Sequence, residues 1–441
     1  MTISPARQAA FSILLRVEEE SAYAAELLHS SLLDPLSSAD RGLAMEIVMG
    51  VLRWRSVLDQ SIARLSFTPF RRLDLEVLTA LRIGAYQKQF LTRVPSHAAV
   101  NETVELVKQA RKTSASGLVN AVMRKMKRGF EPETAAAADV DYLASSLAHP
   151  KWLAGKWVER LGWDRARAIC EYDQRVPQTA LRVASAADEQ ALAQEGVRLE
   201  RGALLASARI VTVGDVASTE ALRRGSVAIQ DEGSQLVAAL VGPGKKILDC
   251  CAAPGGKTAS LATRLPEAEI FAAELHPHRA RLLRRMAPQE NVQVITADAT
   301  SLPFRDAVFD RVLADVPCSG TGTLARNPEI KWRLRAEDLH ELQARQAAIL
   351  GAALRHVASG GRLVYSTCSL EREENEQVVA ACVQRNATVR LVPVKEELLL
   401  LRQAGELVWP DVDGLIEGDF LRTLPGVHPC DGFFAAIFER N

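Results

Sequence analysis

Carboxylates at the ends of strand-like runs are the side chains of this sequence that best suit binding of a nucleotide-type ligand. Glu274, Asp298 and Asp315 each close such a run. Upstream, the apolar run 247–249 leads into a Pro-Gly-Gly turn at 254–256 and then into a helical pattern. Glycines let a backbone pass close to a ligand, and the free amides that begin a helix favour polar or anionic groups. Carboxylates beside such a turn can bind ribose hydroxyls or an adenine edge, so the pattern predicts a cofactor cleft.

Three cofactors compete for a turn of this kind. Gly256-Lys257-Thr258 imitates the end of an ATP-binding P-loop, but P-loop spacing requires glycine five residues before Gly256, where Cys251 stands. NAD sites use G-x-G-x-x-G, and the segment 252–256 lacks that spacing. S-adenosylmethionine is the third candidate, and its sites also place a glycine-rich turn after the first strand and acids after the second and third.

Three motifs follow one another along the C-terminal half of the chain and are specific as a trio. They read Cys-Ala-Ala-Pro-Gly-Gly-Lys at 251–257, Asp-Val-Pro-Cys-Ser-Gly-Thr-Gly at 315–322 and Tyr-Ser-Thr-Cys-Ser-Leu at 365–370. In this trio the chain resembles the RNA cytosine-5 methyltransferase family, in its bacterial 16S ribosomal RNA branch (Sun or Fmu type). The helical N-terminus is similar to the RNA-binding domain of the antitermination factor NusB. The likeness implies S-adenosylmethionine as cofactor and 16S ribosomal RNA, free or partly assembled into the small subunit, as partner.

The resemblance also implies a covalent mechanism. Carbon 5 of cytosine is a poor nucleophile until a thiolate adds to carbon 6. By this likeness Cys368 is the nucleophile and Cys318 assists product release, while Asp315 contacts the cytosine edge and Lys257 supports the catalytic arrangement. The residues implied to bind the cofactor are Cys251, Ala252, Ala253, Pro254, Gly255, Gly256, Lys257, Glu274, Asp298 and Asp315. Glu274 stands where the family usually has aspartate, so its longer side chain must retreat to make the same contacts.

The elements that position these residues alternate regularly in the C-terminal half. Strand-like runs occur at 246–251, 270–274, 292–296, 310–315, 362–366, 389–392 and 432–438, and helical stretches lie between most of them, notably at 336–357 and 371–384. This alternation predicts a doubly wound parallel sheet with ligands at the carboxyl ends of the strands. Cys368 follows directly after a strand, so we expect it to project into that cleft.

The N-terminal part is different, because apolar residues recur there at helical spacing in one segment after another. We expect three parts: an all-helical NusB-like RNA-binding domain at 1–135, a small α+β connecting subdomain at 141–235, and a Rossmann-like S-adenosylmethionine-dependent methyltransferase domain at 236–441. The alanine-rich segment 132–139 is expected to be a linker or a weak helix. Short strands are expected at 181–183, 208–211 and 226–229.

Charge is distributed unevenly along a chain whose formal net charge is zero. Residues 1–130 hold 18 Lys and Arg against 12 Asp and Glu. This excess is compatible with a polyanionic partner and equally with an ordinary solvated helical surface. The basic residues considered for phosphate contacts are Arg53, Arg55, Arg71, Arg72, Arg111, Lys112, Arg124, Lys125, Lys127 and Arg128.

Composition restricts the setting. Hydrophobic residues make up 48% and charged residues 24%, as in ordinary globular proteins, and no apolar run is long enough to span a membrane. Seven cysteines without framework spacing, no Cys-x-x-Cys pair and no signal sequence predict a cytoplasmic protein without a zinc site, which we expect to be a monomer. Two alternatives remain open: a transfer RNA substrate, and an RNA-binding protein with an inactive methyltransferase fold.

Overall fold

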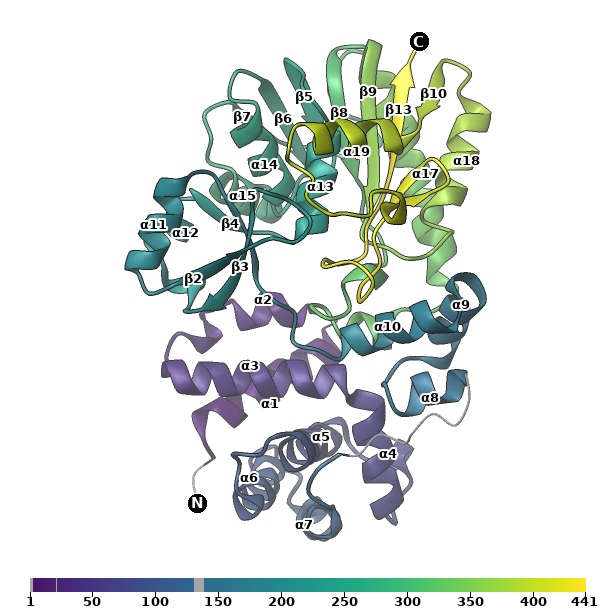
Figure 1. Ribbon diagram of the computed structural model, residues 1–441. Coiled ribbons are helices and arrows are strands. Elements are labelled where there is room, and N and C mark those ends of the chain that lie inside the picture. The colour runs from purple at the N-terminus through teal and green to yellow at the C-terminus, as the bar shows by residue number, and fades with distance from the viewer. Residues whose placement is uncertain (1–2, 21, 131–138) are drawn as a thin grey trace. The chain divides into compact units, whose positions relative to one another are not determined.

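The computed structural model describes residues 3–20, 22–130 and 139–441 and divides the chain into two compact units (Figure 1). Unit 1 comprises Met1–Val176 together with Leu324–Arg333, and unit 2 comprises Pro177–Thr323 and Leu334–Asn441. The segment expected to be a linker lies, apart from Asp139, outside the described residues. The three-part division at 135 and 236 stays a prediction about folding units.

Unit 1 is helical throughout its described part. Its helices are α1 (Pro5–Glu19), α2 (Ala24–Leu28), α3 (Ser38–Arg53), α4 (Arg55–Leu65), α5 (Leu75–Phe90), α6 (Ser96–Gln109), α7 (Ser116–Lys125), α8 (Val140–Ser145), α9 (Lys151–Leu161), α10 (Trp163–Asp173) and α16 (Ile330–Arg333). The last of these belongs to a distant stretch of chain that leaves unit 2 at Thr323 and returns to it at Leu334.

Helix α5 is the centre of the N-terminal bundle. It is buried on every side, unlike an amphipathic surface helix, and it packs against α1, α3, α4, α6 and α7. Glycines permit two close approaches, because a Cβ atom at Gly50 would lie 1.9 Å from the ring of Tyr86, and one at Gly84 would lie 2.4 Å from Oγ1 of Thr103. The bundle therefore confirms the all-helical prediction for the N-terminus.

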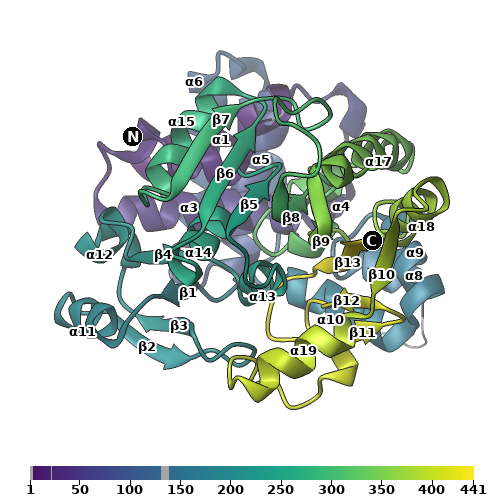
Figure 2. The same cartoon turned by 90° about the horizontal axis from the view of Figure 1, so that it is seen from above.

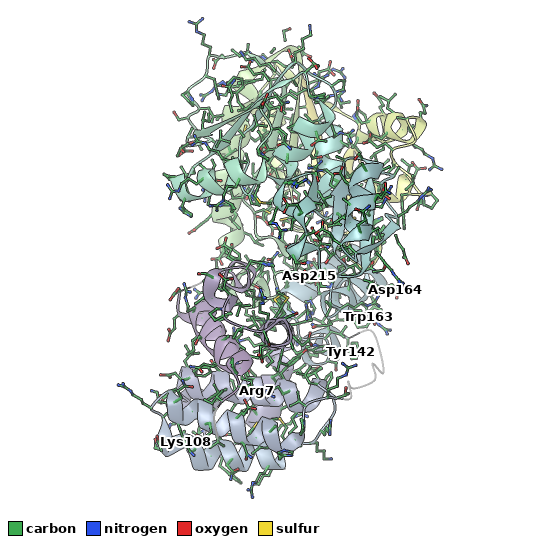
Figure 3. The ribbon with its side chains drawn as sticks, turned by 90° about the vertical axis from the view of Figure 1, so that its left-hand side faces the viewer. Arg7, Lys108, Tyr142, Trp163, Asp164 and Asp215 are labelled. Carbon is green, nitrogen blue, oxygen red and sulfur yellow. The ribbon has the colours of Figure 1, made fainter. Side chains whose placement is uncertain are left out.

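Helices α8, α9 and α10 extend unit 1 beyond this bundle. Tyr142 and Trp163, whose ring centroids lie 6.4 Å apart, join α8 to α10 (Figure 3). Trp157 of α9 is fully buried and its ring lies edge-on to the imidazole of His149, 5.8 Å between centroids. Aromatic packing thus stabilises this part of the unit.

Three of the basic residues considered for phosphate contacts have partners inside unit 1 instead. Arg53 is buried and its guanidinium donates to the Ala325 carbonyl at 3.1 Å. Arg55 pairs with Glu18 at 2.7 Å. Lys112 pairs with Asp74 at 3.0 Å. Arg53 is thus buried, and Arg55 and Lys112 are partly exposed and ion-paired, so the expectation of phosphate contact stays a prediction for these three residues.

Unit 2 begins with a small antiparallel sheet. Its elements are β1 (Ala180–Val183), α11 (Ala186–Gln194), β2 (Arg198–Arg201), β3 (Ala208–Val213), α12 (Glu220–Arg223) and β4 (Val227–Ile229). The strand order β2-β3-β1-β4 is that of the ferredoxin-like split βαβ unit. Strand β2 escaped the sequence analysis because it is a charged, exposed edge strand without an apolar face.

The large sheet of unit 2 carries the predicted alternation. Its elements are α13 (Glu232–Leu240), β5 (Lys246–Asp249), α14 (Gly256–Arg264), β6 (Glu269–Glu274), α15 (Pro277–Met286), β7 (Val292–Thr296), β8 (Phe309–Asp315), α17 (Asp338–His356), β9 (Val357–Thr367), α18 (Glu376–Arg385), β10 (Val389–Val392), α19 (Val394–Gln403), β11 (Ile416–Glu417), β12 (Phe420–Arg422) and β13 (Phe434–Arg440). The order β7-β6-β5-β8-β9 is parallel and can be followed in Figure 2.

The far edge of the sheet departs from the prediction of a wholly parallel arrangement. Strand β13 runs antiparallel to β9, with Phe434 opposite Thr367, and β10 and β12 run antiparallel to β13. No helix lies in the connection 423–433 before β13, so nothing returns the chain to the opposite end of the sheet as a parallel crossover requires. The Rossmann-like fold class is confirmed, with a mixed sheet.

Alternate residues of the central strands feed two cores, one on each face of the sheet. Ile247, Leu313 and Val364 pack with apolar residues of α13, α14 and α19. Their chain neighbours Leu248 and Leu363 pack with residues of α17 and α18. This is the two-residue period of a strand covered on both faces. Within the described ranges, none of the helices has the length and apolar character needed to cross a membrane.

Candidate active site

The predicted cofactor turn and the two cysteine motifs meet at one end of the large sheet. Its parallel strands are ordered so that β5 lies between β6, the next strand in the chain, and β8. Between β5 and β8 the order of strands reverses, and in doubly wound folds ligands bind at such a reversal, outside the carboxyl ends of the strands. Asp249 ends β5 and Asp315 ends β8, so both carboxylates lie at this point.

The glycine turn leads from β5 into α14. Gly255 has a φ of 118°, a left-handed conformation that strongly favours glycine, and it caps the helix that begins at Gly256. Thr258, in the first turn of α14, donates to Asp249 Oδ2 at 2.7 Å, whereas Asp249 Oδ1 is buried without a partner. Burial raises the pKa of Asp249 to about 7.

Two of the three predicted cofactor acids are gathered around Cys251. Burial, followed by the charges of Asp249, Asp315 and Glu274, raises the pKa of the Cys251 thiol. Glu274 itself is buried, and its Oε1 accepts the amide of His276 at 2.9 Å. Its longer side chain therefore folds back onto its own turn, as expected for glutamate in an aspartate position.

Asp298 differs from the other two acids because it is exposed. Its Oδ1 accepts from the amide and the hydroxyl of Thr300, both at 2.8 Å. These hydrogen bonds lower the pKa of Asp298. The carboxylate thus closes its own turn, and its predicted contact with an adenine edge stays a prediction.

Lys257 and Asp315 form an ion pair at the floor of the cleft. Lys257 Nζ lies 2.7 Å from Asp315 Oδ2, and Ser366 donates to Asp315 Oδ1, also at 2.7 Å. Ser366 can reach this oxygen because it lies opposite Asp315 in the register of β8 and β9. Burial opposes the charge of Lys257, but the Asp315 carboxylate more than offsets it, so the pKa of Lys257 is raised.

The two predicted cysteines are neighbours in space although 50 residues separate them. Cys318 Sγ and Cys368 Sγ lie 3.4 Å apart, within hydrogen-bonding distance for sulfur. The hydrogen bond to Cys368, followed by burial, raises the pKa of the Cys318 thiol. Cys318 therefore holds its proton at neutral pH and can share it with Cys368. The charge of Cys368 is also among the causes that raise the pKa of Lys257, which places this ammonium group near the same sulfur.

Glu374 holds the two cysteine loops together and was missed as a site residue by the sequence analysis. The carboxylate is buried and accepts from the Ser319 amide at 2.7 Å, from Gln346 Nε2 at 2.8 Å, and from the hydroxyls of Ser319 and Ser369. Ser319 and Ser369 each follow a site cysteine, so the repeated Cys-Ser dipeptide was the available signal. In the structure these two serines connect the loops, because both hydroxyls donate to the Glu374 carboxylate.

Backbone contacts fasten the same two loops a little further on. The amide of Gly322 donates to the Cys368 carbonyl at 2.8 Å, and the Leu370 amide donates to Thr321 Oγ1 at 2.9 Å. Gly322 also lies so close to Gly432 that a Cβ atom would stand 2.2 Å from the Gly432 carbonyl oxygen. Any side chain at position 322 would separate these segments, so the sulfur pair depends on glycine there.

The turn between β5 and α14 suits a cofactor that carries both positive charge and hydroxyl groups. Asp249, Asp315 and Glu274 bring carboxylates to one place, and Asp249 Oδ1 and Gln230 Oε1 are buried acceptors without a partner. A Cβ atom at Gly256 would lie 3.8 Å from Gln230, and glycine leaves that space open. Sulfonium, ammonium and ribose hydroxyl groups are the complement of such acceptors, so these residues fit S-adenosylmethionine.

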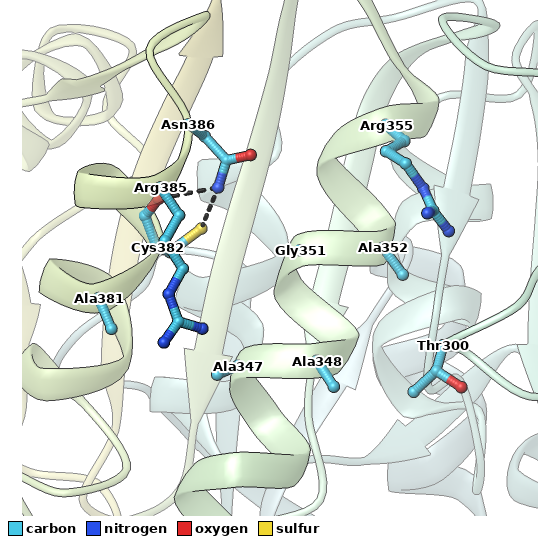
Figure 4. A pocket seen from close by; sticks show the side chains of 10 residues that line it. All are labelled: Thr300, Ala347, Ala348, Gly351, Ala352, Arg355, Ala381, Cys382, Arg385 and Asn386. Carbon is cyan, nitrogen blue, oxygen red and sulfur yellow. Dashed lines mark hydrogen bonds between the residues drawn. The ribbon is translucent and has the colours of Figure 1, made fainter.

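A separate groove lies on the outer side of unit 2, between α17 and α18 (Figure 4). It has a volume of about 370 Å³ and is floored by small side chains, with Arg355 and Arg385 at its margins and Cys382 beside Asn386. The predicted catalytic and cofactor residues are absent from its lining. The groove is therefore distinct from the cleft at the strand ends.

A Rossmann-like sheet with an acid-lined glycine turn at its reversal point defines a class, the S-adenosylmethionine-dependent methyltransferases. Comparison with known proteins agrees: residues 239–439 match the family described as 16S rRNA methyltransferase RsmB/F, and residues 4–128 match the NusB family. The chain belongs to the RsmB/F methyltransferase family.

Two relatives span nearly the same length. The probable ribosomal RNA small subunit methyltransferase B of Bacillus subtilis is 33% identical over 99% of this chain and 98% of its own. Ribosomal RNA small subunit methyltransferase B of Pseudomonas putida is 35% identical over 86% of this chain and 88% of its own. At this identity over most of both chains, the likeness extends through both units.

Solved structures support the fold. The crystal structure of PH0851 superimposes with a TM-score of 0.82 at 23% identity and covers all of both chains. A methyltransferase homologue from Pyrococcus horikoshii gives a TM-score of 0.55 at 27% identity and covers 68% of this chain and 98% of its own.

Proposed function

We propose that this protein methylates carbon 5 of a cytidine in 16S ribosomal RNA through a covalent bond between Cys368 and the base. The observation that carries the proposal is the pair of cysteine sulfurs 3.4 Å apart, next to the Lys257–Asp315 ion pair. Relatives along the whole chain are named small subunit ribosomal RNA methyltransferases, which supports the RNA class of the substrate.

The residues of the cleft divide the work between them. The Cys368 thiolate adds to carbon 6 and forms a sulfur–carbon bond, and the electron pair of the ring then makes carbon 5 nucleophilic. Bound S-adenosylmethionine supplies the methyl group. Carbon 5 next loses its proton to a base, the sulfur–carbon bond breaks, and its electron pair returns to Cys368. We assign Cys318 to this release step as the proton donor: its sulfur lies 3.4 Å from that of Cys368, and its raised pKa keeps on it a proton that it can give to the departing sulfur.

Lys257 and Asp315 orient rather than react. Asp315 holds Lys257 with one carboxylate oxygen and Ser366 with the other. Each of these oxygens has a second lone pair, so the carboxylate can also accept from the exocyclic amine of cytosine. The Lys257 ammonium lies in the field of the Cys368 sulfur, which contributes to the raised pKa of Lys257. The cofactor would lie along 251–257 with its ribose toward Glu274.

The target base must leave any helix to reach Cys368, because this side chain is partly buried in the protein. An unpaired cytidine costs least to bring there, so a loop or bulge of free or partly assembled ribosomal RNA is the proposed substrate. Among the basic residues proposed for phosphate contacts, the fully exposed ones are Arg71, Arg72, Arg111, Arg124, Lys125, Lys127 and Arg128.

The test is transfer of radiolabelled methyl groups to 16S ribosomal RNA from cells that lack this gene, followed by mapping of 5-methylcytidine. Cys368→Ala is expected to abolish transfer and to keep cofactor binding. Cys318→Ala is expected to accumulate a slow-migrating protein–RNA adduct on a denaturing gel. Cys382→Ala, which changes a cysteine of the outer groove, is the matched control and should keep turnover. Full turnover by Cys368→Ala would refute the nucleophile assignment.

Substrate choice is tested in the same assay. Transfer RNA offered beside 16S ribosomal RNA should remain unmodified. Preferential labelling of transfer RNA would mean that the same reaction has transfer RNA as its substrate. Methyl groups on a ring position other than carbon 5 would refute the covalent mechanism.

A further inference from the structure

A second cavity lies in unit 2, between the small antiparallel sheet and helices α13 and α14. It has a volume of about 210 Å³ and is lined by Arg182, Val183, Ala184, Leu205, Ser207, Gln235, Ser260, Thr263 and Arg264. None of these residues belongs to the proposed active site. The cavity is smaller than pockets that enclose a whole cofactor, which suits one small group of atoms.

The cavity exists because one face of the small sheet packs against the methyltransferase domain. Leu181 and Val183 of β1 point into the core beneath α11 and α12. Arg182 lies between them in sequence and therefore points to the opposite face, toward α14. Ala208 on the neighbouring strand β3 joins the core that contains Leu236 of α13. One face of an antiparallel sheet is commonly exposed to solvent. Here helices α13 and α14 cover that face, and Arg182 lies between the sheet and these helices.

Arg182 is a buried cation without a compensating acid. It is 6% exposed, and its Nη1 donates to Thr263 Oγ1 at 3.1 Å. Its Nε and Nη2 groups have no hydrogen-bond partner. The charged group whose field acts on it is another cation, Arg264, and burial together with this repulsion lowers the pKa of Arg182. Isolated buried charges are costly and are ordinarily paired, so this guanidinium lacks the anion that its setting requires.

The neighbouring groups do not supply that anion. Arg264 forms an ion pair with Glu406 through both carboxylate oxygens, which uses the nearby negative charge. Ser207, Ser260 and Thr263 also line the cavity. The Thr263 hydroxyl already donates to the Ala259 carbonyl at 2.9 Å, so Ser207 and Ser260 supply the hydroxyls that can donate to an anion. Thr263 and Arg264 are exposed, so a ligand can enter from solvent.

We propose that this cavity binds a single phosphate group, held by Arg182 with the surrounding hydroxyls. A guanidinium presents its N–H groups in a planar fork that matches phosphate oxygens, and hydroxyls complete a tetrahedral set of contacts. The group is either a backbone phosphate of the RNA substrate or free inorganic phosphate, since both offer the same oxygens. The site goes beyond the proposed methylation and does not depend on which ring atom is methylated.

The phosphate arm of the test uses inorganic phosphate and the full chain. Orthophosphate at about ten times its dissociation constant, compared with chloride at equal ionic strength, should raise the melting temperature of the wild type by about 2–4 °C. Arg182→Met should lose this response, while Arg201→Met, an exposed arginine of the same sheet, should keep it. Should Arg182→Met fail to fold, Ser207→Ala removes a hydroxyl of the cavity lining and should weaken the response.

The RNA arm measures binding of a 16S ribosomal RNA fragment at several salt concentrations. If the phosphate belongs to RNA, Arg182→Met lowers the slope of log affinity against log salt by about 1, and Arg201→Met does not. A response in either arm supports the site and identifies its source. Unchanged phosphate stabilisation and an unchanged salt slope in Arg182→Met would overturn it. Methyl transfer is assayed alongside, so a protein that passes the phosphate arm without methylating RNA loses only the proposed function.

Discussion

Two clusters of buried charge, one in each unit, differ in what surrounds them. The cysteine cleft of unit 2 consists of Lys257, Asp315, Cys318, Cys368 and Glu374. Its ion pair lies at the end of a sheet, where side chains retain some exposure: 13% for Lys257 and 27% for Asp315. The charges are therefore sheltered but within reach of a ligand. A cluster with this arrangement can bind and react.

The lysine cluster of unit 1 is enclosed completely. Lys331 is 1% exposed and its Nζ donates to the Arg53 carbonyl at 3.0 Å. Asp173 is fully buried beside His149, with 3.1 Å between Oδ2 and Nε2. Burial lowers the pKa of Lys331 and raises that of Asp173, and each partner's charge opposes the shift of the other.

The comparison teaches that strongly shifted pKa values alone do not mark a functional site. Both clusters contain them, and only one borders a ligand turn. In unit 1 the buried charges help to hold a distant segment of the chain in place, because Lys331, Trp332 and Arg333 belong to the segment 324–333. Trp332 Nε1 donates to the Leu52 carbonyl at 2.6 Å, and Arg333 donates to the Val17 carbonyl at 2.8 Å. These contacts fix the segment within the helical unit.

The largest expected effect is on stability, from Lys331→Ala. The substitution removes the hydrogen bond from Lys331 to the Arg53 carbonyl and part of the positive charge around the buried Asp173, which should lower the free energy of unfolding of unit 1 by about 3 kcal/mol. Urea denaturation measures this change. Lys108→Ala, at an exposed position of α6 (Figure 3), should change it by less than about 0.5 kcal/mol.

Methyl transfer separates the two clusters further. Per folded molecule and at saturating RNA, Lys331→Ala should retain turnover, since the contacts of Lys331 with Arg53 and Asp173 lie within unit 1. A stable Lys331→Ala protein without turnover would contradict the conclusion that the lysine cluster is only structural, and would make it a functional site.

Glu374→Ala is expected to have the next largest effect. It should lower the turnover rate and leave substrate binding nearly unchanged. Removing the carboxylate frees Ser319 and Ser369, so the sulfurs of Cys318 and Cys368 lose their fixed spacing. Misplacement by about 1 Å commonly costs roughly 100-fold in rate, and we expect a loss of that order in kcat with little change in KM. Glu341→Ala on the exposed face of α17 is the control.

The conservative change tests whether Glu374 positions the loops. Glu374→Gln keeps an oxygen that accepts from the Ser319 amide and should recover much of the rate. After the Cys368 hydrogen bond and burial, the Glu374 charge contributes to the raised pKa of Cys318. Neutralising it should therefore move the pH profile of adduct release to lower pH. Equal losses in both variants with an unmoved profile would assign Glu374 a purely structural role.

The effect of Asp249 on stability depends on pH and is smaller within any one pH unit, because it is spread over the range between its unfolded and folded pKa values. Burial raises its pKa from 3.8 to about 7 in the folded protein, so between these values the folded state holds a proton that the unfolded state releases. Its contribution to stability is full below about pH 4 and is lost as the pH rises toward 7, by at most about 1.4 kcal/mol per pH unit. Asp249→Asn should remove this slope, and Thr258→Val, which keeps the carboxyl, should retain it.

Sequence reasoning located the parts of the molecule that depend on local pattern. Apolar runs that end in acids became β6 and β8, and the two cysteine motifs met in space because the carboxyl ends of parallel strands share one edge of a sheet. The roles of Cys368 and Cys318 came from the family resemblance and remain proposals.

The remaining features depend on partners far away in sequence. Nothing around Lys331 indicates that its neighbours are Arg53 and Asp173. The antiparallel direction of β13 depends on the route taken by the preceding connection, and the sequence predicted only that a strand was there. Arg182 reads as one polar residue in a short strand until the opposite face of its sheet is seen to be covered. Local propensity carries no information about such pairings.

The smallest expected effect concerns the exposed basic surface of unit 1. Deleting residues 1–130 is a poor test of RNA binding, because the segment 324–333 packs against those residues and would lose its partners. Single substitutions avoid this. Lys125, whose Nζ lies 4.8 Å from the ring centroid of the exposed Phe67, is a charge beside an aromatic surface on which a base can stack.

Lys125→Gln should lower the slope of log RNA affinity against log salt by about 1, because one phosphate contact is lost. Lys112→Gln is the matched control, since Lys112 is already paired with Asp74 and Glu76 and should contribute little to the slope. The pair of variants extends the comparison of clusters to the surface, where a compensated and an uncompensated lysine lie in the same unit. Equal slopes in both variants would mean that unit 1 meets RNA elsewhere or not at all, and its charge excess would then be an ordinary solvated surface.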